Sequence, residues 1–179
     1  GWRCDGFFIA STKTVLDPND PGFGAVDIPH QFEESYHNLW QKMRTILAYT
    51  HDNYLNDFDY FYVVNDDAPV VVENLRRYLG VLEARGLKNE KTPLLTGEIV
   101  GRYTGGGSGH LFNRLALRRM VKDVLPVCRP DDKTSADDRY IATCLGVGMV
   151  DSVDDNGRPR FHGRAAHEIW KESSPGRRV

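Results

Sequence analysis

The chain has 179 residues, of which 40% are hydrophobic and 27% charged, which is enough for one globular domain with a sizeable core. Its formal net charge of -2 and pI near 6.3 provide no global basic field, so a nucleic-acid backbone is a poor candidate partner. No stretch approaches the roughly 20 apolar residues that span a bilayer.

The first third of the chain predicts a strand, a loop and a long helix. Residues 6–10 form a short apolar run typical of a buried strand, and residues 17–29 are rich in Pro, Asp and Gly without periodicity, which predicts a loop. Apolar residues at helical spacing predict an amphipathic helix from about 33 to 54. They are Leu39, Trp40, Met43, Ile46, Leu47 and Tyr54.

The middle of the chain predicts a strand, a turn and a second helix. Residues 59–64 read as a strand that leads into Asn65-Asp66-Asp67. Pro69 fits the first turn of a helix, and Gly86 is a plausible C-terminal cap for it. The apolar positions of this helix are Val72, Leu75, Leu79 and Leu82.

The last part predicts a strand at 94–100, a glycine run at 105–109, a helix after it, and a further helix at about 136–145. The helix after the glycine run carries Leu115, Leu117, Met120, Val121 and Val124. Alternating strands and helices indicate an α/β fold with a mixed or largely parallel sheet. We therefore predict a single domain over 1–179 with a basic, flexible tail at 163–179.

Two acid pairs are candidates for chemistry, and each has a purely structural alternative. Asp66 and Asp67 either end a strand in a turn, or bind a hard cation at the carboxyl end of a buried strand, where open α/β sheets bind ligands. Asp137 and Asp138 either begin a helix with Ser135 as its N-cap, or include a general base.

The glycine run and the single His162 are also ambiguous. The run matches neither a Walker loop nor a G-x-G-x-x-G motif, so it is equally compatible with a flexible surface loop and with close approach to a ligand. His162 follows a polar turn, where an exposed histidine is common, although a neutral imidazole nitrogen would complete an oxygen-rich metal site.

The three cysteines do not have metal-binding or thioredoxin spacing. Cys128 and Cys144 are either buried free thiols or, in an oxidising compartment, a disulfide pair. Cys4 would then be single or bonded to a residue outside the chain. Because the sequence lacks an initiator Met and opens close to a strand, we expect a piece of a longer protein.

Several segments form a recognisable series when they are read in chain order. They are the helix at 39–48 with Lys42, residues 54–61, Asn65-Asp66-Asp67 with residues 70–75, Tyr103 with the run from Gly105 to His110, the helix start at 115–117, Asp137-Asp138 between Cys128 and Cys144, and Phe161-His162. In this order they resemble the inverting β-1,3-glycosyltransferases of the core 1 galactosyltransferase and fringe type.

The resemblance implies a GT-A-like fold, with a Rossmann-type mixed sheet flanked by helices, acting in the Golgi or secretory-pathway lumen as part of a type II membrane protein. It implies transfer of a hexose such as galactose from a UDP-sugar to a glycan or glycoprotein hydroxyl in β-1,3 linkage, with Mn²⁺ as cofactor. Asp67 and His162 would hold the metal and Asp138 would be the catalytic base. The donor-binding residues would be Lys42, Asn65, Asp66, Gly106 and Gly107.

Two departures from the family pattern leave a non-catalytic reading open. Asn65 replaces the first Asp of the family motif, and the family's first strand would precede Cys4 and is missing. The alternative function is therefore a glycosyltransferase-like chaperone or binding module. A Mg-dependent phosphoryl-transfer or hydrolase domain ranks last, because we find neither its phosphate loop nor its catalytic Lys.

Overall fold

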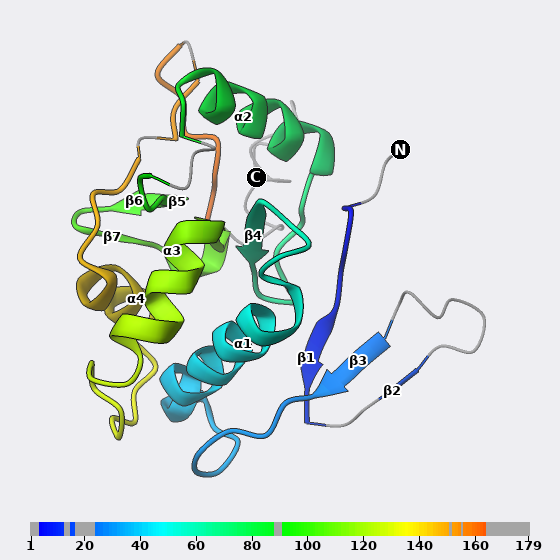
Figure 1. The fold of residues 1–179 in the computed structure, drawn as a ribbon, viewed down its shortest axis with the longest axis vertical. Coiled ribbons are helices and arrows are strands. Elements are labelled where there is room, and N and C mark those ends of the chain that lie inside the picture. Colours follow the sequence, from blue (N-terminus) through cyan, green and yellow to red (C-terminus); the bar gives the residue numbers. More distant parts are fainter. Residues whose placement is uncertain are drawn as a thin grey trace, which may run out of the picture.

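The structure is a computed structural model that describes residues 4–12, 15–16, 24–87, 91–150, 152–154 and 156–163 (Figure 1). All of the predicted basic tail except Gly163 lies outside these residues. Among the described residues, no helix combines the length and the apolar character needed to cross a membrane.

Helices and strands alternate along most of the chain. The α-helices of the described part are α1 (Leu39–Tyr54), α2 (Val72–Ala84), α3 (Arg114–Arg119) and α4 (Asp137–Leu145). Shorter helical turns are Tyr36–Asn38 and Gly106–Ser108, both 3₁₀, and the π-helical Met120–Val124. The strands are β1 (Ile9–Ser11), β2 (Val15–Leu16), β3 (Gly24–Asp27), β4 (Tyr60–Val63), β5 (Leu95–Gly97), β6 (Ile99–Val100), β7 (Tyr103–Thr104) and β8 (His110–Asn113).

The central sheet has the strand order β4-β8-β5, and β8 is antiparallel to both neighbours. β4 and β5 therefore run in the same direction and are joined through α2, as the α/β prediction requires, but β8 lies between them. A parallel bridge between Leu95 and Met149 adds to this sheet, and β1-β3-β2 forms a separate mixed sheet. The mixed α/β class is confirmed, whereas a largely parallel sheet is wrong for the described strands.

Two apolar clusters cover opposite faces of the central sheet. Successive residues of a strand point to opposite faces, so Phe112 joins the cluster under α1, α3 and α4 while Leu111 joins the one under α2. Figure 1 shows β4 between α2 and α1. Trp40, Leu47, Phe112 and Ile141 are fully buried in the first cluster, so each excludes a large apolar area from water.

Several predicted element boundaries shift for local reasons. The helix expected from about 33 begins at Leu39, because residues 36–38 form a 3₁₀ turn in which the Ser35 hydroxyl accepts the His37 amide. The helix expected at Pro69 begins at Val72, because the backbone of its N-cap residue Val71 is extended. Gly86 ends α2 as predicted: it follows the C-cap residue Arg85 and has a positive φ of 74°.

The second half of the chain shows two further differences and one confirmed helix. The single strand expected at 94–100 is split into β5 and β6 at Glu98. The predicted helix after the glycine run is present as α3 and its π-helical continuation. The predicted N-cap Ser135 is wrong, because Ala136 caps α4 without a side-chain bond and the Thr134 hydroxyl accepts the Ala136 amide.

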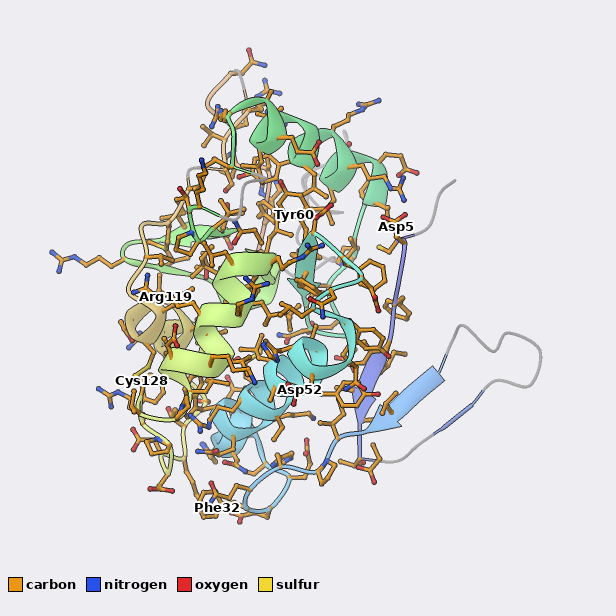
Figure 2. The ribbon with its side chains drawn as sticks, viewed as in Figure 1. Asp5, Phe32, Asp52, Tyr60, Arg119 and Cys128 are labelled. Carbon is orange, nitrogen blue, oxygen red and sulfur yellow. A yellow bond between two sulfur atoms is a disulfide. The ribbon has the colours of Figure 1, made fainter. Side chains whose placement is uncertain are left out.

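Of the two alternatives for Cys128 and Cys144, free thiols or a disulfide pair, the structure has the disulfide. Cys128 and Cys144 form a disulfide that ties α4 to the segment after the π-helical turn, and Figure 2 shows Cys128 next to α4. Cys4 is exposed and is a free cysteine.

Replacing Gly109 with Ala is expected to destabilise the fold by about 2 kcal/mol in urea unfolding. Gly109 has φ +77°, and a Cβ there would lie 2.7 Å from the Val63 carbonyl oxygen on β4. Gly80→Ala is the matched control, because Gly80 lies inside α2 with nothing within 4 Å of a Cβ. It should stabilise by about 0.5 to 1 kcal/mol. Similar effects of the two substitutions would contradict this account.

Candidate active site

The glycine run forms an ordered turn between β7 and β8, which we call the glycine turn (residues 105–109). The Ser108 side chain is buried, and its hydroxyl donates to the Gly105 carbonyl at 3.2 Å and accepts the Glu98 amide at 3.1 Å. The Gly109 amide donates to the Gly106 carbonyl at 3.0 Å. The run is thus a packed turn whose close neighbours are protein atoms, and its approach to a ligand stays a prediction.

Atoms from three other segments lie directly against the glycine turn. A Cβ built on Gly106 would be 3.6 Å from the Asp138 Cβ, and one on Gly107 would be 3.1 Å from the Gly163 carbonyl oxygen. On the side of β4, the Tyr62 hydroxyl donates to the Ser108 carbonyl. A Cβ at Gly106 would be in ordinary contact with Asp138, whereas a Cβ at Gly107 would force the Gly163 carbonyl to shift slightly. The turn therefore joins the start of α4, the segment after Phe161 and the end of β4.

The first acid pair lies just beyond the end of β4. Asn65, Asp66 and Asp67 are all exposed, and the Ala68 amide closes a turn onto the Asn65 carbonyl at 3.2 Å. The structural interpretation, a turn after a strand, is correct. Both carboxylates are exposed, and the strand that precedes them ends beside the glycine turn, because Val63 pairs with His110, the first residue of β8.

His162 follows a buried aromatic anchor. The Phe161 side chain is 8% exposed, and its ring centroid lies 6.0 Å from that of Tyr62 and 5.6 Å from that of Tyr78. His162 itself is exposed. Because Tyr62 belongs to β4, the Phe161 contact places the chain around His162 beside the strand that leads to Asp67.

The second acid pair begins α4, and its two members have different surroundings. Burial, and next the charge of Asp138, raise the pKa of Asp137 to about 6. The Asp138 Oδ1 atom accepts the Arg139 amide at 2.7 Å, and the Arg139 guanidinium lies over the Tyr103 ring at 5.3 Å. Asp138 is the member whose side chain lies against the glycine turn, and its role as the base stays a prediction.

His110 is a buried histidine that sequence reasoning did not single out as functional. Its side chain is 1% exposed, its Nδ1 lies 2.7 Å from the Thr104 hydroxyl, and its Nε2 has no hydrogen-bond partner among the described residues. Burial lowers its pKa to about 4, partly opposed by the charge of Asp138. His110 is therefore neutral at physiological pH. Its place directly after the glycine run was the available sequence signal.

Lys42 has a clear local partner on α1. Its ammonium group lies 2.6 Å from Glu34 Oε1, and the other Glu34 oxygen lies 2.7 Å from His30 Nε2. The structure thus places Lys42 in a surface ion-pair group, and its assignment to the donor site stays a prediction. The same is true of the joint binding of a metal by Asp67 and His162.

The donor atoms predicted for the metal fit Mn²⁺ in their chemistry, because a carboxylate oxygen and an imidazole nitrogen both suit such an ion. Within the described ranges, no three His, Cys, Asp or Glu side chains are grouped as a cage for a metal. A site with two protein ligands would therefore need oxygens from a diphosphate and from water, as hard cations at phosphate sites commonly do.

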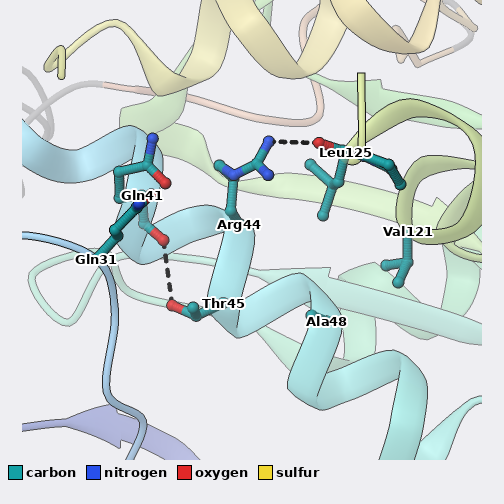
Figure 3. Close-up of a pocket in the computed structure, with 8 residues that line it drawn as sticks. Gln31, Gln41, Arg44, Thr45, Ala48, Val121 and Leu125 are labelled. Carbon is teal, nitrogen blue, oxygen red and sulfur yellow. Dashed lines mark hydrogen bonds between the residues drawn. The ribbon is translucent and has the colours of Figure 1, made fainter. Parts of the chain in front are cut away.

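A separate surface pocket of about 310 Å³ lies between α1 and residues 121–126 (Figure 3). Its one charged side chain, Arg44, donates to the Leu125 carbonyl at 2.7 Å, so its hydrogen-bonding capacity is partly used within the protein. None of the residues that line this pocket is a predicted site residue. The surroundings of the glycine turn, rather than this pocket, hold the candidate active site.

The known proteins that are similar to this chain in sequence include glycosyltransferases. No family model matches the chain. The chain is 33% identical over 132 residues to a glycoprotein-N-acetylgalactosamine 3-beta-galactosyltransferase 1 from Xenopus laevis. The aligned residues cover 69% of this chain and 34% of the relative. It is 30% identical over 115 residues to human chondroitin sulfate glucuronyltransferase, covering 60% of this chain and 15% of the relative. It is 27% identical over 114 residues to mouse chondroitin sulfate synthase 3, covering 59% and 13%.

These matches identify the class of protein: the chain is a homologue of glycosyltransferases. Within that class, the resemblance to the core 1 galactosyltransferase type, predicted from the ordered motifs, is confirmed. The chain spans about a third of the length of the amphibian relative and less of the other two.

Proposed function

We propose that the chain is the catalytic part of an inverting, GT-A-type glycosyltransferase. It transfers a hexose, galactose in the simplest case, from a UDP-sugar to a hydroxyl of a glycan or glycoprotein in β-1,3 linkage. The observation that supports the proposal is that three groups of atoms from distant segments lie against the glycine turn: the Asp138 side chain, the Gly163 backbone next to His162, and the Tyr62 hydroxyl on the strand that leads to Asp66 and Asp67. Segments far apart in the sequence thus meet around one ordered turn.

In the proposed reaction Asp138 is the general base. Its carboxylate takes the proton of the acceptor hydroxyl while that oxygen attacks the anomeric carbon from the face opposite the diphosphate. The bond between the anomeric carbon and the diphosphate oxygen breaks with its electron pair leaving on UDP, so a single displacement inverts the carbon. The geometry parallels that of inverting glycosidases, with a sugar hydroxyl in place of water.

The remaining site residues would bind and orient the donor. Asp67 and His162 would hold Mn²⁺, which when bound supplies Lewis-acid stabilisation of the departing diphosphate. Asn65 and Asp66 would contact the nucleotide, and Gly106 and Gly107 let the backbone approach it closely. Asn65 carries no charge where the family has an acid, so we expect weaker metal or donor binding than in relatives with three acids.

The disulfide supports a place in the Golgi or secretory-pathway lumen, because such bonds persist in oxidising compartments. A membrane anchor would be supplied by a segment outside these residues. The second candidate function, a non-catalytic chaperone or binding module, is favoured by one observation, the replacement of an acid by Asn65 in the exposed turn.

Asp67→Ala is expected to weaken Mn²⁺-dependent binding of UDP by at least about tenfold, because it removes a direct metal ligand. The measurement is isothermal calorimetry on the full-length protein with UDP, in the presence and absence of Mn²⁺. Asp57→Ala is the matched control, since Asp57 is an exposed acid at the opposite end of β4. Wild-type protein without Mn²⁺-linked UDP binding would refute the enzyme proposal and favour the chaperone alternative.

A further inference from the structure

Glu98 connects the glycine turn to the segment that carries His162. Its amide donates to the Ser108 hydroxyl at 3.1 Å, and its carbonyl accepts the Gly105 amide at 2.8 Å. Its carboxylate oxygen Oε2 accepts the Gly163 amide at 2.7 Å. Glu98 also interrupts the predicted strand at 94–100, so the break between β5 and β6 coincides with these bonds. The amide, the carbonyl and one carboxylate oxygen of Glu98 thus join two segments of the candidate site.

His162 is fixed on both sides along the chain. On one side, the buried Phe161 ring packs between Tyr62 and Tyr78. On the other, Gly163 is bonded to Glu98 and lies so close to it that a Cβ on Gly163 would collide with the Glu98 carboxylate. Gly107 also lies against Gly163, because a Cβ on Gly107 would be 3.1 Å from the Gly163 carbonyl oxygen. The backbone of His162 is therefore held in place while its imidazole remains exposed.

We propose that Glu98 is a positioning residue for His162. Its carboxylate holds the peptide between His162 and Gly163 against the glycine turn, so that the imidazole is already ordered when a metal-diphosphate group binds. The role of the ordered imidazole rests on the proposed function. A carboxylate suits this task better than an amide, because charged acceptors make shorter and stronger bonds to N–H groups.

The magnitude of the effect follows from the ordering of one residue. Fixing the backbone of a single residue has an entropic cost that corresponds to about a tenfold change in affinity. Glu98→Ala removes the acceptor and should weaken Mn²⁺-dependent UDP binding about tenfold. Glu98→Gln retains an acceptor oxygen without the charge, so it should restore much of the affinity and also shows whether the fold tolerates the change.

The decisive experiment is a double-mutant cycle on the full-length protein with Glu98→Ala, His162→Ala and the double variant. If Glu98 acts through His162, adding Glu98→Ala to His162→Ala should have little further effect on Mn²⁺-dependent UDP affinity, measured by calorimetry. The proposal would be overturned if Glu98→Ala lowered the UDP affinity equally in the wild-type protein and in the His162→Ala variant. Asp123→Ala, at an exposed acid on the π-helical turn, is the matched control and should bind like wild type.

A second readout does not depend on the proposed function. In ¹H–¹⁵N spectra the Gly163 amide should resonate downfield as the donor of a charge-assisted bond, move upfield in Glu98→Ala, and shift only partly in Glu98→Gln. An unchanged Gly163 signal in Glu98→Ala would refute the contact that holds His162. If wild-type protein shows this amide signature but no Mn²⁺-linked UDP binding, the proposed function fails while the anchoring of the His162 segment by Glu98 stands.

Discussion

Replacing Asp138 with Asn is expected to lower the rate of sugar transfer by about 10²- to 10⁴-fold, the usual contribution of a general base. The amide has nearly the same shape and keeps an oxygen to accept the Arg139 amide, but it does not accept the proton of the acceptor hydroxyl. Because the lost step concerns the acceptor, kcat should fall while Mn²⁺-dependent UDP affinity stays close to that of wild type. Initial rates on the full-length protein, together with UDP calorimetry, measure both quantities.

Asp137→Asn is the matched control for this prediction. Asp137 neighbours Asp138 on the first turn of α4, but burial raises its pKa to about 6, and Asp138 is the residue whose side chain lies against Gly106. Asp137→Asn should therefore retain most of the transfer activity. A larger loss in Asp137→Asn than in Asp138→Asn would reverse the two roles and assign the base to the residue with the raised pKa.

Local sequence patterns were sufficient for the elements whose signals are local. The apolar periodicities of α1 and α2 and the helix at Asp137–Leu145 are present, as is the strand that leads into Asn65. β8 was not predicted as a strand, and its place in the sheet has no local signal, because its four residues pair with strands about 50 and 15 residues away. Periodicity within β8 does not show which strands it will join. The sheet is therefore less parallel than the alternation of elements indicated.

The candidate site shows the same division between local and long-range information. The ordered motifs singled out Asp138 and Gly106, which lie against each other in the structure, because the residue types themselves carry that signal. Glu98 was missed, since its role depends on a hydrogen bond to Gly163, 65 positions along the chain. Long-range contacts of this kind are invisible in a single sequence, and they decide which of several plausible polar residues share one site.

His110 on β8 and Asp137 at the start of α4 have opposite effects on the pH dependence of stability. The pKa of His110 is about 4 in the folded protein against an ordinary 6.5, so the unfolded chain takes up this proton first and stability is lost as the pH falls from 6.5 to 4. The pKa of Asp137 is about 6 against an ordinary 3.8, so the folded protein takes up that proton first and stability is gained as the pH falls from 6 to 4.

Asp137→Asn is expected to unmask the His110 effect. At pH 7 the variant should be more stable than wild type by about 2 kcal/mol, because it no longer buries a carboxylate, and the difference should vanish near pH 4. As the pH falls from 7 to 4, the free energy of unfolding of the variant should decrease by about 3 kcal/mol because of His110. In the wild-type protein the opposite effect of Asp137 makes this decrease smaller. Urea unfolding at several pH values between 4 and 7 measures both curves.

Asp66→Asn serves as the reference for this comparison, because it makes the same chemical change at an exposed acid and should leave the stability within about 0.5 kcal/mol of wild type. The informative result is the sign at pH 7. An Asp137→Asn variant that is less stable than wild type at neutral pH would mean that the interaction of the carboxylate with the start of α4 outweighs its burial. Asp137 would then stabilise the start of the helix. Its carboxylate would be retained for that stabilising effect, despite the neighbouring charge of Asp138, and not for a role in the reaction.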